Sequence, residues 1–272
     1  MTILQAVILG LVEGITEYLP ISSTGHLILA KSLLGLENPA SNAFIIMIQG
    51  GAILAVIGLY RRRVSQIFRG LMGADAAGRR LMFNLLIAFA PAAIFGLLLG
   101  SFVQEWLFAA SPVVGALAAG GVIMILAPRG RKATTEIDAL SWRAALVIGA
   151  IQVIAMWPGT SRSMVTILGG LLVGLRPRQA AEFSFLLGVP TLGAACIYSA
   201  AKSLTGDEVS MLEALGWTPV LVGFAVATIS AMVAIRWLVS YLTRHGLAIF
   251  GWYRLVLASA LALLIARGIL SI

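Results

Sequence analysis

Six long apolar runs constrain the fold of this chain more than any other feature. Each is close to the length that crosses the hydrocarbon core of a bilayer, which needs about 20 helical residues. Hydrophobic residues make up 60% of the 272 positions and charged residues only 11%, whereas soluble domains are about 25% charged. We therefore expect an all-α integral membrane protein, with six transmembrane helices at 44–60, 83–101, 111–127, 183–203, 217–240 and 251–270.

Two further apolar regions are interrupted in the middle by a proline and a cluster of hydroxyl residues. Residues 1–36 contain the stretch LPISSTG, and residues 141–175 contain WPGTSRS. Proline cannot simply continue a helix, and the Ser and Thr residues that follow suit the N-cap of a new one. Each region is therefore predicted to be a re-entrant hairpin of two short helices, of the kind that lines polar cavities in membrane proteins.

The distribution of charge predicts the orientation of these segments. The segment 61–80 carries six arginines against Asp75 alone and 128–143 is also basic, whereas 203–216 carries only acidic charge. Because short cytoplasmic loops are enriched in Lys and Arg, the first two should be cytoplasmic and the third external. The two hairpins then enter from opposite faces, and one membrane domain divides into inverted repeat halves of about 1–127 and 128–272.

Net charge is +8, and in a soluble protein such a basic chain would suggest nucleic acid. Here the positive residues lie between apolar runs, as topology requires of cytoplasmic loops. We therefore expect no nucleic-acid partner.

The first break contains two carboxylates. Glu13 and Glu17 are four residues apart and share a helix face, so they repel each other and are costly to desolvate. A divalent cation would satisfy both, and Mg²⁺ characteristically takes one or two carboxylates together with substrate phosphates. The alternative is a pair at the water interface, which the neighbouring Tyr18 would suit.

Hydroxyl residues and a histidine follow the glutamates. Ser22, Ser23 and Thr24 suit either a simple helix cap or a phosphate site at a helix N-terminus. His26 lies in the next turn, near two acids and three hydroxyls, which is the setting of a general base or proton shuttle. A structural histidine is the alternative.

The second break places a single arginine between two serines. Arg162, flanked by Ser161 and Ser163, is the only basic residue between Arg143 and Arg176. A guanidinium deep in an apolar fold favours an anion, and its paired N–H groups match phosphate oxygens. A salt bridge to one of the two glutamates is compatible with this interpretation, because such a bridge can yield to substrate.

These motifs closely resemble the undecaprenyl-diphosphatase family of bacteria, the bacitracin-resistance type. The segments GLVEGITEYLPISSTGHLIL, IQGGAILAVI, WPGTSRSMVTILGG and AAEFSFLLGVPT carry the resemblance, in order and over nearly the whole chain. It implies a multi-pass enzyme of the bacterial inner membrane that removes the terminal phosphate from undecaprenyl diphosphate. The family uses Mg²⁺ or Ca²⁺ at an active site facing the periplasm, and its product is the lipid carrier for peptidoglycan.

The resemblance and the residue chemistry together suggest roles at the two breaks. We expect His26 either to activate a water or to assist Ser23 as nucleophile, and the sequence leaves both open. The expected metal ligands are Glu13 and Glu17, the expected catalytic residues are Glu17, Ser23, His26 and Arg162, and the expected phosphate-binding residues are Ser22, Thr24, Ser161, Arg162 and Ser163.

A lipid-phosphate transporter or flippase is the main alternative function. Inverted repeats and broken helices are typical of transporters, and the same pocket could bind a phosphate without cleaving it. The partners we expect are undecaprenyl diphosphate and membrane lipids, and a homodimer is an assembly that the sequence leaves open.

Overall fold

The computed structural model describes residues 1–36, 39–107, 109–127, 133–205 and 215–268, with the backbone alone at 39, 104 and 198–205. No strand occurs in these ranges, which contain one isolated β-bridge, between Thr135 and Leu175. The elements are α1 (Ile3–Tyr18), α2 (Ser23–Leu33), α3 (Pro39–Leu59), α4 (Arg61–Leu71), α5 (Ala76–Trp106), α6 (Ala110–Leu126), η1 (Ile137–Ala139), α7 (Trp142–Gln152), η2 (Val153–Met156), α8 (Arg162–Leu172), α9 (Pro177–Thr205), α11 (Trp217–Leu242) and α12 (Ala248–Ala266).

Among the described residues, five helices are long and apolar enough to cross a membrane, which makes the chain a multi-pass membrane protein. They belong to α3, α5, α9, α11 and α12, and they coincide with five of the six predicted spans. The remaining predicted span, 111–127, forms α6, a shorter apolar helix of 17 residues. Such a helix rises about 26 Å, against a hydrocarbon core of about 30 Å. The arrangement of six spans and two re-entrant hairpins therefore stays a prediction.

The basic segment 61–80 differs from the loop that its charge suggested. Arg61–Leu71 forms the helix α4, and α5 begins after Asp75, whose carboxylate accepts a hydrogen bond from the Gly78 N–H at 2.9 Å. Apolar residues recur at helical spacing between the arginines. This periodicity predicts a helix, whereas the charge alone suggested a loop. Much of the charge used to orient the chain, at 128–132 and 206–214, lies outside the described residues.

Both predicted breaks are present. In the first region α1 ends at Tyr18 and α2 begins at Ser23, and in the second η2 ends at Met156 and α8 begins at Arg162. The breaks therefore fall where a proline precedes the hydroxyl cluster, as the sequence predicted.

The two breaks also share an unusual backbone turn. Ser22 and Ser161 have φ angles of 72° and 76°, and they are the only non-glycine residues with positive φ in the described chain. Each serine is the N-cap of the helix that follows, and its hydroxyl accepts a hydrogen bond from the N–H of Gly25 or Met164, respectively. Strained positive φ at a polar residue is typical of a functional site.

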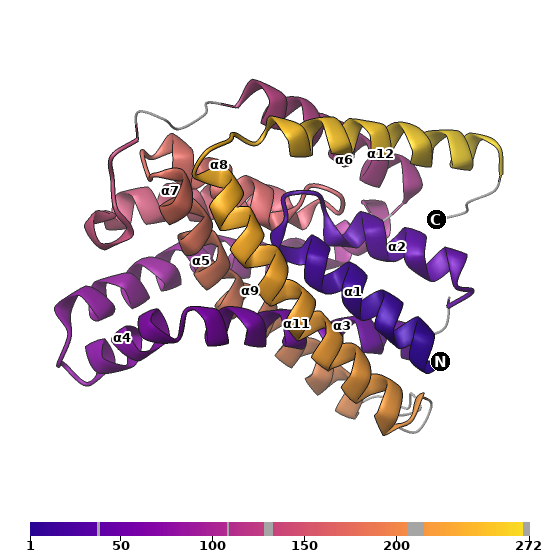
Figure 1. The fold of residues 1–272 in the computed structure, drawn as a ribbon, viewed down its shortest axis with the longest axis horizontal. Coiled ribbons are helices and arrows are strands. Elements are labelled where there is room, and N and C mark those ends of the chain that lie inside the picture. The colour runs from indigo at the N-terminus through magenta and orange to yellow at the C-terminus, as the bar shows by residue number, and fades with distance from the viewer. Residues whose placement is uncertain (37–38, 108, 128–132, 206–214, 269–272) are drawn as a thin grey trace.

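Close helix packing holds the breaks in place. The helix α1 lies alongside α11 (Figure 1), and a Cβ at Gly14 would collide with the Ser230 hydroxyl and the Ala227 carbonyl of that helix. In the same way α7 packs on α5, where Gly149 meets the backbone of Ala88. Small residues let such backbones approach closely in membranes, so the first helix of each broken region is fixed against a long apolar helix.

Candidate active site

A cavity of about 250 Å³ lies where the two breaks meet. Residues from α1 and α2 of the first region and from η2 and α8 of the second line it, and α3 and α9 contribute further polar groups. The polar and charged residues of its lining are Glu17, Ser22, Ser23, Thr24, Gln49, Gln152, Ser161, Arg162 and Thr191.

The ion pair between Glu17 and Arg162 joins the two breaks. The Arg162 Nη2 donates to Glu17 Oε1 at 2.9 Å, and the two side chains are only 9% and 6% exposed. The expected proximity of these residues is confirmed. Such a buried pair is costly to break from one side only, because the remaining charge is left unpaired.

Several groups hold the Arg162 guanidinium in position. Its Nη1 donates to the Ser184 carbonyl oxygen at 2.9 Å, and its Cζ lies 5.5 Å from the ring centroid of Tyr18. A Cβ at Gly188 would come within 2.7 Å of Nη2, so the guanidinium occupies space that any side chain there would take. Its Nε is buried and has no hydrogen-bond partner.

The second oxygen of Glu17 binds the first hydroxyl of α2. Ser23 Oγ donates to Glu17 Oε2 at 2.7 Å. A hydroxyl paired with a carboxylate at this distance has the geometry of a nucleophile and its general base. Glu17 therefore links a hydroxyl from the first break to a cation from the second.

Glu13 is fully buried, and neither of its carboxylate oxygens has a hydrogen-bond partner. An unpaired buried carboxylate is costly, and a hard cation with oxygen ligands would compensate it. The described residues contain no group of three or more His, Cys, Asp and Glu side chains that could hold a metal alone. Glu17 lines the cavity, whereas Glu13 is not among its lining residues, and the unpaired oxygens of Glu13 are of the type that a divalent cation binds.

His26 forms its hydrogen bonds outside the ion pair. Its Nδ1 lies 2.7 Å from the Ser22 carbonyl oxygen, its Nε2 lies 2.7 Å from the Tyr253 hydroxyl, and the two rings stack. Because a carbonyl only accepts, Nδ1 must carry a proton, and Nε2 of the neutral ring then accepts from Tyr253. His26 makes no hydrogen bond to Ser23 or Glu17 in this arrangement and instead anchors the backbone at Ser22.

The remaining predicted residues divide between the cavity and its supports. Thr24 and Ser161 line the cavity, whereas Ser163 is fully buried and donates to the Leu19 carbonyl oxygen at 3.1 Å. That bond ties α8 directly to the end of α1. The suggestion that Tyr18 marks a water interface is wrong, because its ring is fully buried and its hydroxyl donates to a carbonyl of α3.

Arg254 is a buried cation that the sequence analysis missed. It is fully buried in α12, and its guanidinium donates to the carbonyl oxygens of Gly159 and Thr160 in the second break at 2.8 and 2.7 Å. It also donates to the carbonyls of Ala116 and Leu117 in α6. An arginine within a predicted span was the available signal, since such residues are rare and functional.

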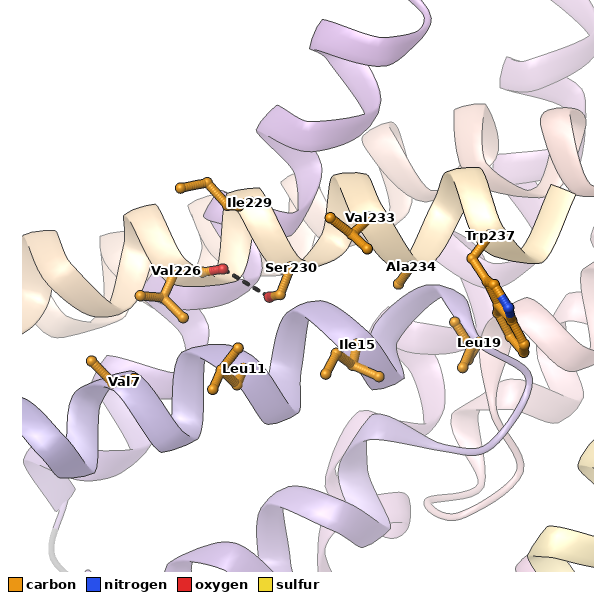
Figure 2. A pocket seen from close by; sticks show the side chains of 10 residues that line it. All are labelled: Val7, Leu11, Ile15, Leu19, Val226, Ile229, Ser230, Val233, Ala234 and Trp237. Carbon is orange, nitrogen blue, oxygen red and sulfur yellow. Dashed lines mark hydrogen bonds between the residues drawn. The ribbon is translucent and has the colours of Figure 1, made fainter. Parts of the chain in front are cut away.

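A larger groove of about 680 Å³ between α1 and α11 lacks such chemistry (Figure 2). Its lining is apolar apart from Ser230, whose hydroxyl donates to the Val226 carbonyl at 2.7 Å. Successive helical residues turn by about 100°, so Gly10 and Gly14 lie between the groove face of α1 and the glutamate face. The tight seam with α11 at these glycines separates the groove from the polar cavity.

Comparison with known proteins identifies one family over most of the chain. Residues 6–260 match the model described as bacitracin resistance protein BacA. The chain is 46% identical over 259 residues to undecaprenyl-diphosphatase 2 of Rhodospirillum rubrum. The alignment covers 93% of this chain and 91% of that protein. It is 45% identical over 255 residues to the undecaprenyl-diphosphatase of Nitrosomonas europaea, with 93% and 91% covered.

Proposed function

The chain belongs to the bacitracin resistance protein family BacA, and on that premise we propose that it hydrolyses undecaprenyl diphosphate to undecaprenyl phosphate and inorganic phosphate. The observation that carries this proposal is the hydrogen-bonded cluster of Ser23, Glu17 and Arg162 at the meeting point of the two breaks. The reaction recycles a lipid carrier for envelope polymers and so accounts for bacitracin resistance.

Binding of the terminal phosphate falls to Arg162 and the helix N-termini. The guanidinium fork matches two phosphate oxygens, and its unpartnered Nε is a further donor. The N-termini of α2 and α8 add positive potential and backbone N–H groups at Ser22 and Ser161. When substrate enters, its phosphate takes the place of Glu17 beside Arg162.

Release of Glu17 from the arginine leaves its carboxylate beside Ser23. We assign Glu17 as the base that accepts the Ser23 hydroxyl proton while Oγ attacks the terminal phosphorus. The bond from Oγ to phosphorus forms, the phosphoanhydride bond breaks, and undecaprenyl phosphate leaves with the bridging oxygen. A water oxygen then bonds to the phosphorus, the bond from Oγ to phosphorus breaks, Oγ recovers the proton from Glu17, and inorganic phosphate leaves. The arginine stabilises the transferred phosphoryl charge throughout.

Glu13 and Glu17 are the residues that would hold a divalent cation, Mg²⁺ or Ca²⁺. The unpartnered oxygens of Glu13 support this assignment. When bound, the cation would neutralise negative charge on the phosphate oxygens. His26 and Tyr253 act on the site by fixing the turn that presents Ser23.

The surroundings of the site complete the proposal. We place the protein in the bacterial inner membrane with the cavity open to the periplasm, as inverted repeat halves of about 1–127 and 128–272. The reciprocal packing of α1 on α11 and α7 on α5, together with the matching serine turns, supports the repeat. A homodimer stays a prediction, which the mass of the protein in detergent would test.

The test is phosphate release by purified protein in micelles with undecaprenyl diphosphate, with and without a chelator. The wild-type protein should release phosphate, and the chelator should stop the release. Glu17→Gln and Arg162→Gln should each lower the rate by about a thousandfold or more, while the exposed residues Glu105 and Arg79 serve as matched Gln controls.

Rapid quenching distinguishes the nucleophile. Labelled phosphate trapped on Ser23 supports the covalent step, whereas full turnover by Ser23→Ala would assign attack to water. Binding of the substrate without any phosphate release would overturn the hydrolase and favour the transporter.

A further inference from the structure

A second polar cavity, of about 960 Å³, lies away from the two breaks. It is formed where α3 meets α4, at the start of α9 and at one position on α11. Along α9, Arg178 of this cavity and Gly188 beside Arg162 are ten residues apart, which is about 15 Å of helix. The charged residues of its lining are Arg61, Arg62, Arg63, Glu136, Arg176, Arg178, Glu182 and Arg236.

The acidic residues of this cavity are already engaged. Arg63 Nε donates to Glu182 at 2.7 Å, and its Nη1 donates to Asp138 at 2.8 Å. Arg176 pairs with Glu136 at 2.7 Å. These ion pairs join α4, η1 and the start of α9. In the described part of the chain, neither carboxylate of the lining forms an ion pair with a further arginine.

Four arginines of the cavity carry uncompensated charge. In the described part of the chain, Arg61, Arg62, Arg178 and Arg236 are exposed and make no side-chain hydrogen bond or ion pair. They come from three different helices, α4, α9 and α11. Their mutual repulsion within one concave surface is unfavourable unless an anion lies between them.

The positions of these arginines within their helices add to the excess of positive charge in the cavity. Arg61 and Arg62 open α4, and Arg178 lies in the first turn of α9, and neither helix has an acidic residue in its first turn. A helix N-terminus carries partial positive charge and favours acidic side chains. The Tyr60 N-cap of α4 makes no side-chain cap hydrogen bond. Both helices therefore add positive potential to the arginine cluster.

We propose that this cavity is a second anion site, distinct from the catalytic one, that binds a phosphate group. The guanidinium fork suits phosphate oxygens, and four free arginines carry enough positive charge for either a singly charged phosphodiester or a doubly charged phosphate. The phosphate comes either from the headgroup of an anionic lipid or from free inorganic phosphate. The inference is independent of the proposed hydrolysis, because it uses none of the residues at the two breaks.

Binding is tested with two probes on the purified full-length protein. Phosphatidylglycerol is titrated into micelles against phosphatidylcholine, and adducts are counted by native mass spectrometry. Inorganic phosphate is titrated into protein held in phosphatidylcholine nanodiscs. The test variant is Arg178→Gln/Arg236→Gln, and the control is Arg79→Gln/Arg244→Gln, which removes the same charge from exposed arginines outside the cavity.

The cavity variant should lose about tenfold in affinity, while the control keeps wild-type affinity. If the cavity variant loses only phosphatidylglycerol binding, the ligand is a lipid headgroup. If it loses inorganic phosphate binding, the ligand is the free ion. Equal losses in both variants, or no loss in the cavity variant, would overturn the proposal. Thermal unfolding in detergent checks that each variant is folded, and Arg61→Gln/Arg178→Gln replaces the first variant if it is not.

Discussion

The break between α1 and α2 and the break between α7 and α8 use the same backbone turn to present different chemistry. Ser22 and Ser161 occupy the same position with positive φ, and the next residue opens the second helix in both cases. That residue is Ser23 in the first break and Arg162 in the second, and both donate to Glu17. One turn used twice therefore supplies a hydroxyl and a cation to a shared carboxylate.

The two breaks differ in how firmly the protein holds them. In α8 nine of the eleven residues are buried, whereas in α2 only Gly25 and Leu27 are. Arg254 clamps the second break through backbone carbonyls, and His26 with Tyr253 anchors the first. We infer that the second break is the rigid half of the site and that the first has the lower local stability.

The largest effect should come from separating the two charges that join the breaks. Glu17→Gln or Arg162→Gln alone leaves one buried charge unpaired and should cost about 3 kcal/mol of unfolding free energy. The double variant should cost less than the sum, because neither charge remains. A double-mutant cycle of denaturation in detergent measures this, and strictly additive effects would contradict the coupling.

Removing the clamp on the second break should have the next largest effect. Arg254→Met leaves the backbone carbonyls of Gly159 and Thr160 without the guanidinium donor, and each unsatisfied buried group costs about 1 kcal/mol. Hydrogen exchange should become faster in α8 before it changes in α2. Faster hydrogen exchange in α2 alone would show that Arg254 stabilises the first break and not the second, and would contradict this prediction.

A smaller effect should come from moving the Arg162 guanidinium without removing it. Gly188→Ala places a Cβ against the Arg162 guanidinium, so phosphate release should fall by about tenfold or more while the protein stays folded. Gly193→Ala is the matched control on α9, since open space surrounds that position. Equal rates for the two variants would show that the guanidinium adjusts freely.

The smallest effect should come from loosening the first break. Tyr253→Phe removes one hydrogen bond to His26, worth about 1 kcal/mol, and so should lower phosphate release by about fivefold. Tyr241→Phe is the control, because the Tyr241 ring stacks on His245 without a hydroxyl bond in the described structure. A loss as large as that of Arg162→Gln would mean that His26 takes part in the chemistry directly.

Prediction from the sequence was most reliable where a pattern is local. The breaks at Pro20 and Pro158 follow from the missing N–H of proline and from the capping serines beside them, and both were placed correctly. The sequence also allowed a salt bridge from Arg162 to Glu13 or Glu17, and the structure pairs it with Glu17. The helix α4 was not predicted, because its arginines were interpreted as loop charge and the helical spacing of its apolar residues was not considered.

By itself the sequence determined the apolar helices, the two breaks and the set of polar residues that needs compensation inside them, because periodicity, proline and desolvation cost act over a few residues. Only the tertiary structure decided which of those residues face one another. It turned His26 toward Tyr253, set Arg254 beneath the second break and left Glu13 unpaired. Such choices depend on the packing of helices far apart in the chain, and no local pattern encodes them.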